Sequence, residues 1–405
     1  MVRPRTPGTG TAVALVTAAA LFGDTLLYTS LPVSAARLGL DALAVGLVLS
    51  LNRWVRLITN PLAARLFERM PAGGLVIAGL ALAVASTAAY ALPAALALFL
   101  AARLVWGMSW SLLRLGSLLG AIEGSVGRTG RALGDMRAVF GLGYLAGAIY
   151  APFAVESLGW GAAALGAAAL TFALGIGPAL SVTGWRREVD VDERAERAIW
   201  RSLWEPSFVA IFAIAFCQYA TYAGLLAVAG GLRIAELFPA GGAMLGIPVA
   251  ATLVAGLFIL TQRLSQVAWT PFAGRLADRS VARTFLLSTM LAVTAIAALT
   301  AATDATVFVA LGALAFFAGI TSVVAVELAI AHRTTTADRA RVLGAYNTWA
   351  DVGAASGALG GGALALAGTQ VPIALGAWLA AATLLLWTVG RADRGVRSAG
   401  VGVPA

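Results

Sequence analysis

Residues 41–70 read DALAVGLVLSLNRWVRLITNPLAARLFERM, and a related stretch follows 210 positions later at 251–280, ATLVAGLFILTQRLSQVAWTPFAGRLADRS. Nine of the thirty aligned positions are identical without a gap. A shared richness in alanine and leucine does not explain identities at arginine and proline. The identical pairs of these types are Arg53/Arg263, Pro61/Pro271, Arg65/Arg275 and Arg69/Arg279.

The same offset recurs further along the chain. Residues 130–149 (GRALGDMRAVFGLGYLAGAI) align with residues 340–359 (ARVLGAYNTWADVGAASGAL) and share six residues, among them Gly143 with Gly353. Two blocks at one offset predict a chain built from two copies of a unit of about 200 residues.

The composition indicates a membrane protein. Of the 405 residues 60% are hydrophobic and 12% are charged, whereas soluble domains carry about 25% charged residues. All 28 basic residues are arginine, and most of them fall in short gaps between apolar runs, which is typical of membrane orientation and argues against nucleic-acid binding. The single cysteine, Cys217, lies in an apolar run, so we expect a buried thiol without an internal disulfide.

Twelve apolar runs are long enough for membrane-spanning helices, which need about 20 residues because every backbone group must be paired inside the bilayer. The first run follows Arg3 and Arg5 and is too long for a signal peptide, so we interpret it as a span. The predicted spans are 11–36, 42–64, 73–93, 95–120, 132–155, 159–181, 205–231, 247–272, 284–303, 306–330, 342–366 and 371–390.

The loops differ in charge. Those on one side carry only Arg37 and Arg233, whereas those after spans 2, 4, 8 and 10 carry many arginines. We therefore expect the arginine-rich side and both termini to be cytoplasmic, in the inner cell membrane. The arginines of that side are Arg65, Arg69, Arg128, Arg131, Arg275, Arg279, Arg283, Arg333, Arg339 and Arg341.

A polar linker divides the chain into two halves. Residues 183–204 mix both charges with Trp185, Trp200 and Trp204, a pattern typical of a helix on the membrane surface. The predicted domains are a six-helix bundle over 1–182, this cytoplasmic linker, and a six-helix bundle over 205–405. Six spans in each half give both the same orientation, so we expect parallel repeats.

These features resemble the major facilitator superfamily. The second copy of the loop, Gly274-Arg275-Leu276-Ala277-Asp278-Arg279, matches the family's loop signature, and the first copy departs from it at Ala64. Arg103 and Gly107 look like the family's span-4 motif. The Gly143-x-x-x-Gly147 motif resembles that of antiporters, with Ala148 in place of proline. The resemblance implies an all-α protein of twelve transmembrane helices in two bundles, closest in pattern to the drug/proton antiporter branch.

Ionisable side chains deep in a span are costly and mark functional sites. Asp24 lies in the middle of span 1, and Tyr28 shares its helix face. Static ion pairing, such as Asp24 with an arginine of span 4, is the alternative interpretation. Further candidates for a substrate cavity are Arg53, Arg56 and Asn60 in span 2, Arg114 in span 4, Gln262, Arg263 and Gln266 in span 8, Glu327 in span 10, and Asn347 and Asp351 in span 11.

Two other groups invite both a functional and a structural interpretation. The glycine pairs of spans 5 and 11 suit close helix packing, or bending during gating. A second set of charges lies at the inner ends of spans 2 and 8. The family resemblance implies that these residues form a cytoplasmic gate. Membrane orientation alone would explain the arginines of this set but not its two acids. This set is Arg65, Glu68, Arg69, Arg275, Asp278 and Arg279.

The favoured hypothesis is a monomeric secondary transporter that exports a small organic molecule, with proton coupling through Asp24 and Arg103. Uptake or exchange of an anionic metabolite is the alternative, because arginines outnumber acids in the spans. An alternative from a different functional class is a non-transporting membrane protein, such as a receptor or scaffold on a transporter fold. We find no phosphate-binding loop and no catalytic set, and the lone His332 predicts no metal site, so neither an enzyme nor a cofactor is expected.

Overall fold

The computed structural model describes residues 8–92, 95–123, 129–186, 206–239, 241–333 and 336–398. Several predictions lie outside these residues: those for Arg3, Arg5, Arg128, Trp200, Trp204 and most of the 183–204 linker. The side chains of Arg131, His332, Arg333, Arg339 and Arg341 are likewise outside the described part.

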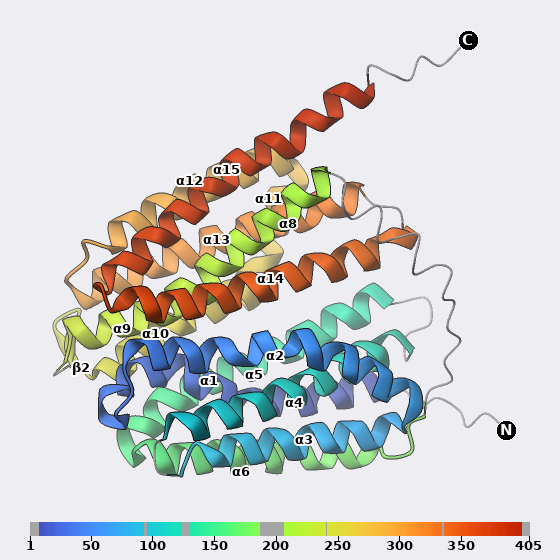
Figure 1. Cartoon of the computed structure of the whole chain (residues 1–405), viewed down its shortest axis with the longest axis vertical. Helices are drawn as coiled ribbons and strands as arrows, with labels where there is room; N and C mark the ends of the chain where they lie inside the picture. Colours follow the sequence, from blue (N-terminus) through green and yellow to red (C-terminus); the bar gives the residue numbers. More distant parts are fainter. Residues whose placement is uncertain are drawn as a thin grey trace.

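The first half of the chain forms one bundle of six long helices, the lower one in Figure 1. Asp41 starts its second helix by accepting a hydrogen bond from the backbone N–H of Ala44 at 2.7 Å, which satisfies one of the free donors of the first turn. The elements are α1 (Thr9–Ser34), η1 (Ala36–Leu38), α2 (Ala42–Arg69), α3 (Ala72–Ala89), α4 (Leu96–Glu123), α5 (Thr129–Leu158) and α6 (Trp160–Ser181).

The second half forms the upper bundle in Figure 1, and two of its long helices contain a π-helical segment. A π segment carries an extra residue within the helix and often marks a functional site. The elements are α8 (Pro206–Tyr219), η2 (Ala220–Leu225), α9 (Leu226–Leu237), β1 (Gly242–Met244), β2 (Ile247–Val249), α10 (Ala251–Leu264), η3 (Ser265–Trp269), α11 (Thr270–Arg279), α12 (Val281–Leu299), α13 (Ala305–Arg333), α14 (Thr336–Ala365) and α15 (Gln370–Ser398).

The prediction of an all-helical membrane bundle is confirmed. Eleven of the described helical segments are long and apolar enough to cross a membrane. Helix α14 is outside that set because polar residues such as Asn347 and Asp351 lower its hydropathy. Cys217 is 8% exposed, as its apolar surroundings predicted.

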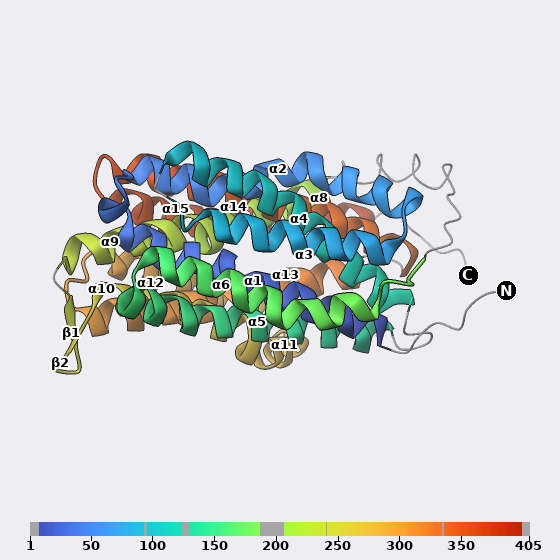
Figure 2. The same ribbon diagram turned by 90° about the horizontal axis from the view of Figure 1, so that it is seen from below.

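One predicted boundary is wrong. The eighth span was expected to begin at residue 247, but residues 247–249 form β2, which pairs antiparallel with β1, and the helix begins at Ala251. Leu245 and Gly246 have φ values of 52° and 81°, the left-handed pair that a two-residue hairpin turn requires. The hairpin lies at the end of the bundles opposite the two chain termini (Figure 2). We call these two ends the hairpin end and the terminal end.

The two bundles touch closely at the hairpin end. A Cβ added to Gly46 of α2 would lie 2.9 Å from the carbonyl oxygen of Ala358 of α14, so only glycine allows this approach. Pro152 of α5 lies against Gly256 of α10 in the same way. Nearby, the Thr252 hydroxyl donates to a Glu156 carboxylate oxygen at 2.6 Å. Small residues and one hydrogen bond thus close this end.

The predicted packing role of the paired glycines is confirmed. Gly143 and Gly147 of α5 lie against the backbone of Ala18 and the side chain of Thr25 on α1. Gly353 and Gly357 of α14 lie against the backbone of α8 and η2 at the corresponding place in the second bundle. In each bundle, therefore, the helix rich in glycine packs tightly on the first helix.

The arginine distribution predicts that the terminal end is cytoplasmic and the hairpin faces outward. We expect Met70→Cys and Leu245→Cys, each in a Cys217→Ser background, to react with a membrane-impermeant thiol reagent from opposite sides of the membrane. Both native side chains are at least half exposed, at 50% and 86%, so neither cysteine is hidden by the fold. Labelling of both from the same side would contradict the predicted topology.

Candidate functional site

A cavity of about 460 Å³ lies between the two bundles. Its walls come from α1, α2, α4 and α5 of the first bundle and from α8, α10, α13 and α14, with η2 and η3, of the second. It reaches Leu118, Met136 and Glu327, which lie near helix ends at the terminal end. Since the bundles close against each other at the hairpin end, the cavity extends from the middle of the molecule toward the terminal end.

The 210-residue offset recurs in the wall of this cavity. Repeat-related positions face the same space from opposite bundles, which is what a pseudo-twofold arrangement of two units produces. The pairs in the wall are Asn52/Gln262, Arg53/Arg263, Arg56/Gln266, Trp106/Phe316, Trp110/Ile320, Arg137/Asn347, Phe140/Ala350 and Tyr144/Ala354.

Asp24 is held by a buried arginine. Nη1 of Arg103 lies 2.7 Å from an Asp24 carboxylate oxygen, and Nε of Arg103 donates to the Val48 carbonyl at 3.0 Å. The Arg103 side chain is fully buried behind the cavity wall, whereas Asp24 lines the cavity. Tyr28 lies beside the pair, 5.7 Å from the Arg103 guanidinium carbon to the ring centre. The predicted pairing of Asp24 with a span-4 arginine is thus observed.

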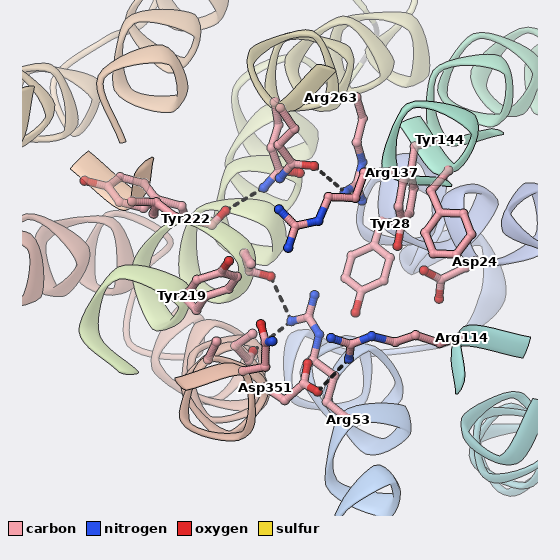
Figure 3. A pocket seen from close by; sticks show the side chains of 18 of the residues that line it. Asp24, Tyr28, Arg53, Arg114, Arg137, Tyr144, Tyr219, Tyr222, Arg263 and Asp351 are labelled. Carbon is pink, nitrogen blue, oxygen red and sulfur yellow. Dashed lines mark hydrogen bonds and ion pairs between the residues drawn. The ribbon is translucent and has the colours of Figure 1, made fainter. Parts of the chain in front are cut away.

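Asp351 links the two bundles across the cavity. Its two carboxylate oxygens lie 3.4 Å from Arg56 and 3.6 Å from Arg114. Both arginines belong to the first bundle and Asp351 to the second, so these ion pairs cross the space that a substrate would enter. Figure 3 shows Arg114 and Asp351 facing each other across it. A carboxylate that bridges two guanidinium groups is held by charge from both sides.

Arg53 makes a second link between the bundles. Its Nη1 donates to the carbonyl oxygens of Ala223 at 2.9 Å and Ala354 at 3.0 Å, both in the second bundle. Ala223 lies in the π segment η2, where the irregular helix leaves a carbonyl available to a partner. Neutral carbonyls satisfy the hydrogen bonds of Arg53 without cancelling its charge.

Two further arginines face the cavity, and neither forms an ion pair with a carboxylate in the described part of the chain. Arg263 lies 4.2 Å from the ring centre of Tyr144 and donates to Gln266 at 3.3 Å. Arg137 projects into the cavity from α5 and is exposed there (Figure 3). Glu327 is the one carboxylate of the wall with no ion pair among the described residues, and the charge of Arg137 acts on it.

The wall therefore has a surplus of positive charge. Among its described residues are five arginines and three acids. Asp24 is neutralised by Arg103, and Asp351 is shared between two arginines, so three arginines remain against the single carboxylate of Glu327. Guanidinium groups bind carboxylate and phosphate oxygens through paired hydrogen bonds. Aromatic side chains between them provide apolar surface for the rest of a small molecule.

The structure places ten of the eleven predicted cavity residues in the wall. Asn60 is the correction: its side-chain oxygen accepts a hydrogen bond from Ser111 of α4 at 2.7 Å, so it is held against the neighbouring helix. The ten residues are Tyr28, Arg53, Arg56, Arg114, Gln262, Arg263, Gln266, Glu327, Asn347 and Asp351.

The predicted gate residues are not brought together. All six of them lie near the terminal end and are exposed, and no ion pair joins any two of them in the part of the chain that the structure describes. These residues are Arg65, Glu68, Arg69, Arg275, Asp278 and Arg279.

Several wall residues were not predicted. Arg137 is the repeat partner of the candidate Asn347, so the alignment itself could have identified it. Further unpredicted wall residues are aromatic or amide side chains inside apolar runs, which a search for charged residues does not find. They include Trp106, Trp110, Tyr144, Gln218, Tyr219 and Tyr222.

The described residues contain no group of three or more His, Cys, Asp or Glu side chains that could hold a metal ion. The chemistry of the wall is that of reversible binding: guanidinium groups, hydroxyls and amides around a space large enough for a small organic molecule.

Comparison with known proteins identifies the family. The model of the Major Facilitator Superfamily matches residues 13–269. A search of curated proteins finds no match.

Solved structures share the fold at low identity. A POT family transporter in complex with a thioalcohol-conjugated peptide has a TM-score of 0.75 and 11% identity, with 95% of this chain and 96% of that chain covered. A POT family transporter in complex with 5-aminolevulinic acid has a TM-score of 0.76 and 11% identity, with the same coverage. A bacterial homolog of the human lysosomal transporter Spinster, inward-facing and unoccupied, has a TM-score of 0.73 and 12% identity, covering 97% of this chain and 96% of that chain.

Proposed function

Because the chain belongs to the Major Facilitator Superfamily of secondary transporters, we propose that its central cavity binds a small organic anion and carries it across the membrane by alternating access. The observation that carries the choice of an anion is the surplus of arginine in the wall. Arg53, Arg137 and Arg263 face the cavity without a carboxylate partner among the described residues, and Glu327 alone offsets them.

The surrounding side chains support this choice. Trp106, Trp110 and Tyr144 offer rings to an organic skeleton, while the arginines offer donors to its acidic group. A cationic substrate would have to approach a wall in which three arginines without an ion pair face the single carboxylate of Glu327. Uptake or exchange of an anionic metabolite therefore fits the site better than export of a cationic compound.

Transport by purified protein in proteoliposomes tests the proposal. In a panel of anionic, neutral and cationic small molecules, we expect at least one carboxylate or phosphate compound to be transported. Arg137→Gln and Arg263→Gln should each raise its half-saturating concentration about tenfold, because a charge-assisted hydrogen bond contributes about 1.5–3 kcal/mol. The matched control is Arg37→Gln, an exposed arginine at the hairpin end, which should behave as the wild type.

Two outcomes would contradict an anionic substrate. One is transport of cationic or neutral compounds only. The other is anion transport with an unchanged half-saturating concentration in both cavity variants. Complete inactivity across the panel, in protein shown to be folded, would instead favour a receptor or scaffold function.

The proposed cycle includes the charged residues of the terminal end. When that end closes, Glu68 on α2 and Asp278 on α11 would approach the arginines of the opposite bundle. They would then form ion pairs that are not present among the described residues of this structure. Each such pair would favour the closed end by about 1 kcal/mol. Unchanged accessibility of this end to thiol reagents in Glu68→Gln and Asp278→Asn, measured with substrate present, would show that these acids are not part of a gate.

We propose proton coupling through Asp24 and Arg103 as the energy source for uptake of the anion, and export in exchange for protons is the alternative direction. The pair lies at the cavity wall, where substrate or closure can disturb it. The titratable and charged groups around Asp24 are Arg103 on α4, Tyr28 on α1, Tyr144 on α5 and Tyr90 at the end of α3. We therefore propose that proton coupling depends on this pair, with Glu327 as the second candidate.

Asp24→Asn separates coupling from a fixed structural pair. If Asp24 couples protons, the folded variant should still exchange substrate across the membrane but lose accumulation driven by a pH gradient. A purely structural pair predicts parallel loss of folding and of all transport modes, because Arg103 would remain buried and unpaired. The measurement compares gradient-driven uptake with substrate exchange. Full gradient-driven uptake in the variant would contradict the role of Asp24 and point to Glu327.

A further inference from the structure

A second hollow of about 810 Å³ lies in the second bundle, between α11, α12 and α13 and apart from the central cavity. Its wall is mainly apolar and its large side chains are open to the surroundings of the bundle: Leu276, Leu287, Leu291 and Leu314 are each at least 40% exposed. In a membrane, such a surface meets lipid. We call this hollow the α11–α13 groove.

The repeat shows how the residues at the groove differ from those at the corresponding place in the first bundle. In the first bundle, Thr59 of α2 hydrogen-bonds to Ser111 of α4 at 2.8 Å, and the missing side chain of Gly107 lets Val55 approach α4. The positions 210 residues later hold Trp269, Thr321 and Phe317. Trp269 donates to Thr321 at 3.0 Å, so the polar link between the two helices is kept.

Two large aromatic rings lie at these positions in the second bundle. Trp269 and Phe317 occupy the place of a threonine and a glycine, with ring centres 5.6 Å apart in an edge-to-face arrangement. The π segment η3 ends at Trp269 and changes the course of the chain before α11. In Figure 2, α11 projects from the lower edge of the bundle. In the first bundle the corresponding end of α2 is packed, with Phe67 buried against Leu75 and Leu112.

One end of the groove carries positive charge. Arg279 and Arg283 line it at the terminal end, both exposed, and neither has an ion pair with a carboxylate among the described residues. The hydroxyl-bearing Ser280 and Thr284 lie beside them. From Arg283 to Leu291, α12 rises by about 12 Å, close to the roughly 15 Å depth of hydrocarbon in one leaflet.

We propose that the α11–α13 groove binds one anionic phospholipid of the surrounding bilayer, with its phosphate at Arg279 and Arg283 and an acyl chain along Leu287, Leu291 and Phe317. The charged end of the groove lies at the membrane surface, where a phosphate headgroup would lie. The apolar part continues over about the depth of one leaflet, where an acyl chain would lie. A free anion would contact the two arginines but would leave the apolar wall of the groove uncovered. A lipid without a negative charge would cover the wall but would leave both arginines without an anionic partner.

The proposal is tested by native mass spectrometry of the full chain, extracted from vesicles that contain equal amounts of phosphatidylglycerol and phosphatidylcholine. The wild type should retain phosphatidylglycerol several-fold more than phosphatidylcholine. Arg283→Gln removes charge at the groove, and Ala313→Phe fills its wall, so each should reduce phosphatidylglycerol retention several-fold. Arg69→Gln, at the packed end of α2, is the matched control and should retain it.

Equal retention of the two lipids would contradict the proposal, because it would leave the arginines without a role. Undiminished phosphatidylglycerol retention in either groove variant would also contradict it. Thermal unfolding of each variant in lipid-free detergent serves as the check on folding. The result does not depend on the transported substrate, so failure here is distinct from failure of the transport proposal.

Discussion

A guanidinium group inside an apolar bundle must donate its hydrogen bonds to oxygen atoms of the protein, because the bilayer core offers no water to solvate it. This constraint accounts for the main contacts between and within the bundles. Arg103 donates hydrogen bonds to Asp24 and to the Val48 carbonyl, both in the first bundle. Arg53 reaches two carbonyls of the second bundle, and Arg56 shares Asp351 with Arg114. The arginines therefore stabilise the interface between bundles while leaving positive charge in the cavity.

The two ends of that interface are built differently. At the hairpin end, Gly46 allows the close approach of the α14 backbone and Gly256 that of the Pro152 ring, and Thr252 donates a hydrogen bond to Glu156 across the interface. At the terminal end, Glu68 and Asp278 are exposed, and no ion pair joins them to the opposite bundle within the described residues. Close packing is insensitive to a bound ligand, whereas charge pairs respond to the charges around them. An anion that neutralises the cavity would therefore act on the terminal end in particular.

Sequence reasoning predicted the twelve-helix architecture because apolar length is set by bilayer thickness, and the offset of 210 residues predicted which positions correspond. It located most of the charged residues of the cavity wall, because ionisable residues in apolar spans are costly. It missed Tyr144 and Tyr222, which are amphipathic and common in apolar runs. The choice of partners for Asp351 could not be predicted, because it depends on how helices of separate bundles align across the cavity. The hairpin was missed because strands of three residues are too short to show a period.

The proposed transport cycle requires that an anion bound between the bundles reverses which end is open. Distances between spin labels across both ends of one preparation in lipid nanodiscs test it most directly. One label pair would join Met70 and Ala282 at the terminal end, and the other would join Leu158 and Leu366 at the hairpin end. On addition of a transported anion, the account predicts a shorter distance at the terminal end and a longer one at the hairpin end. Unchanged distances at both ends, or changes in the same direction, would contradict it.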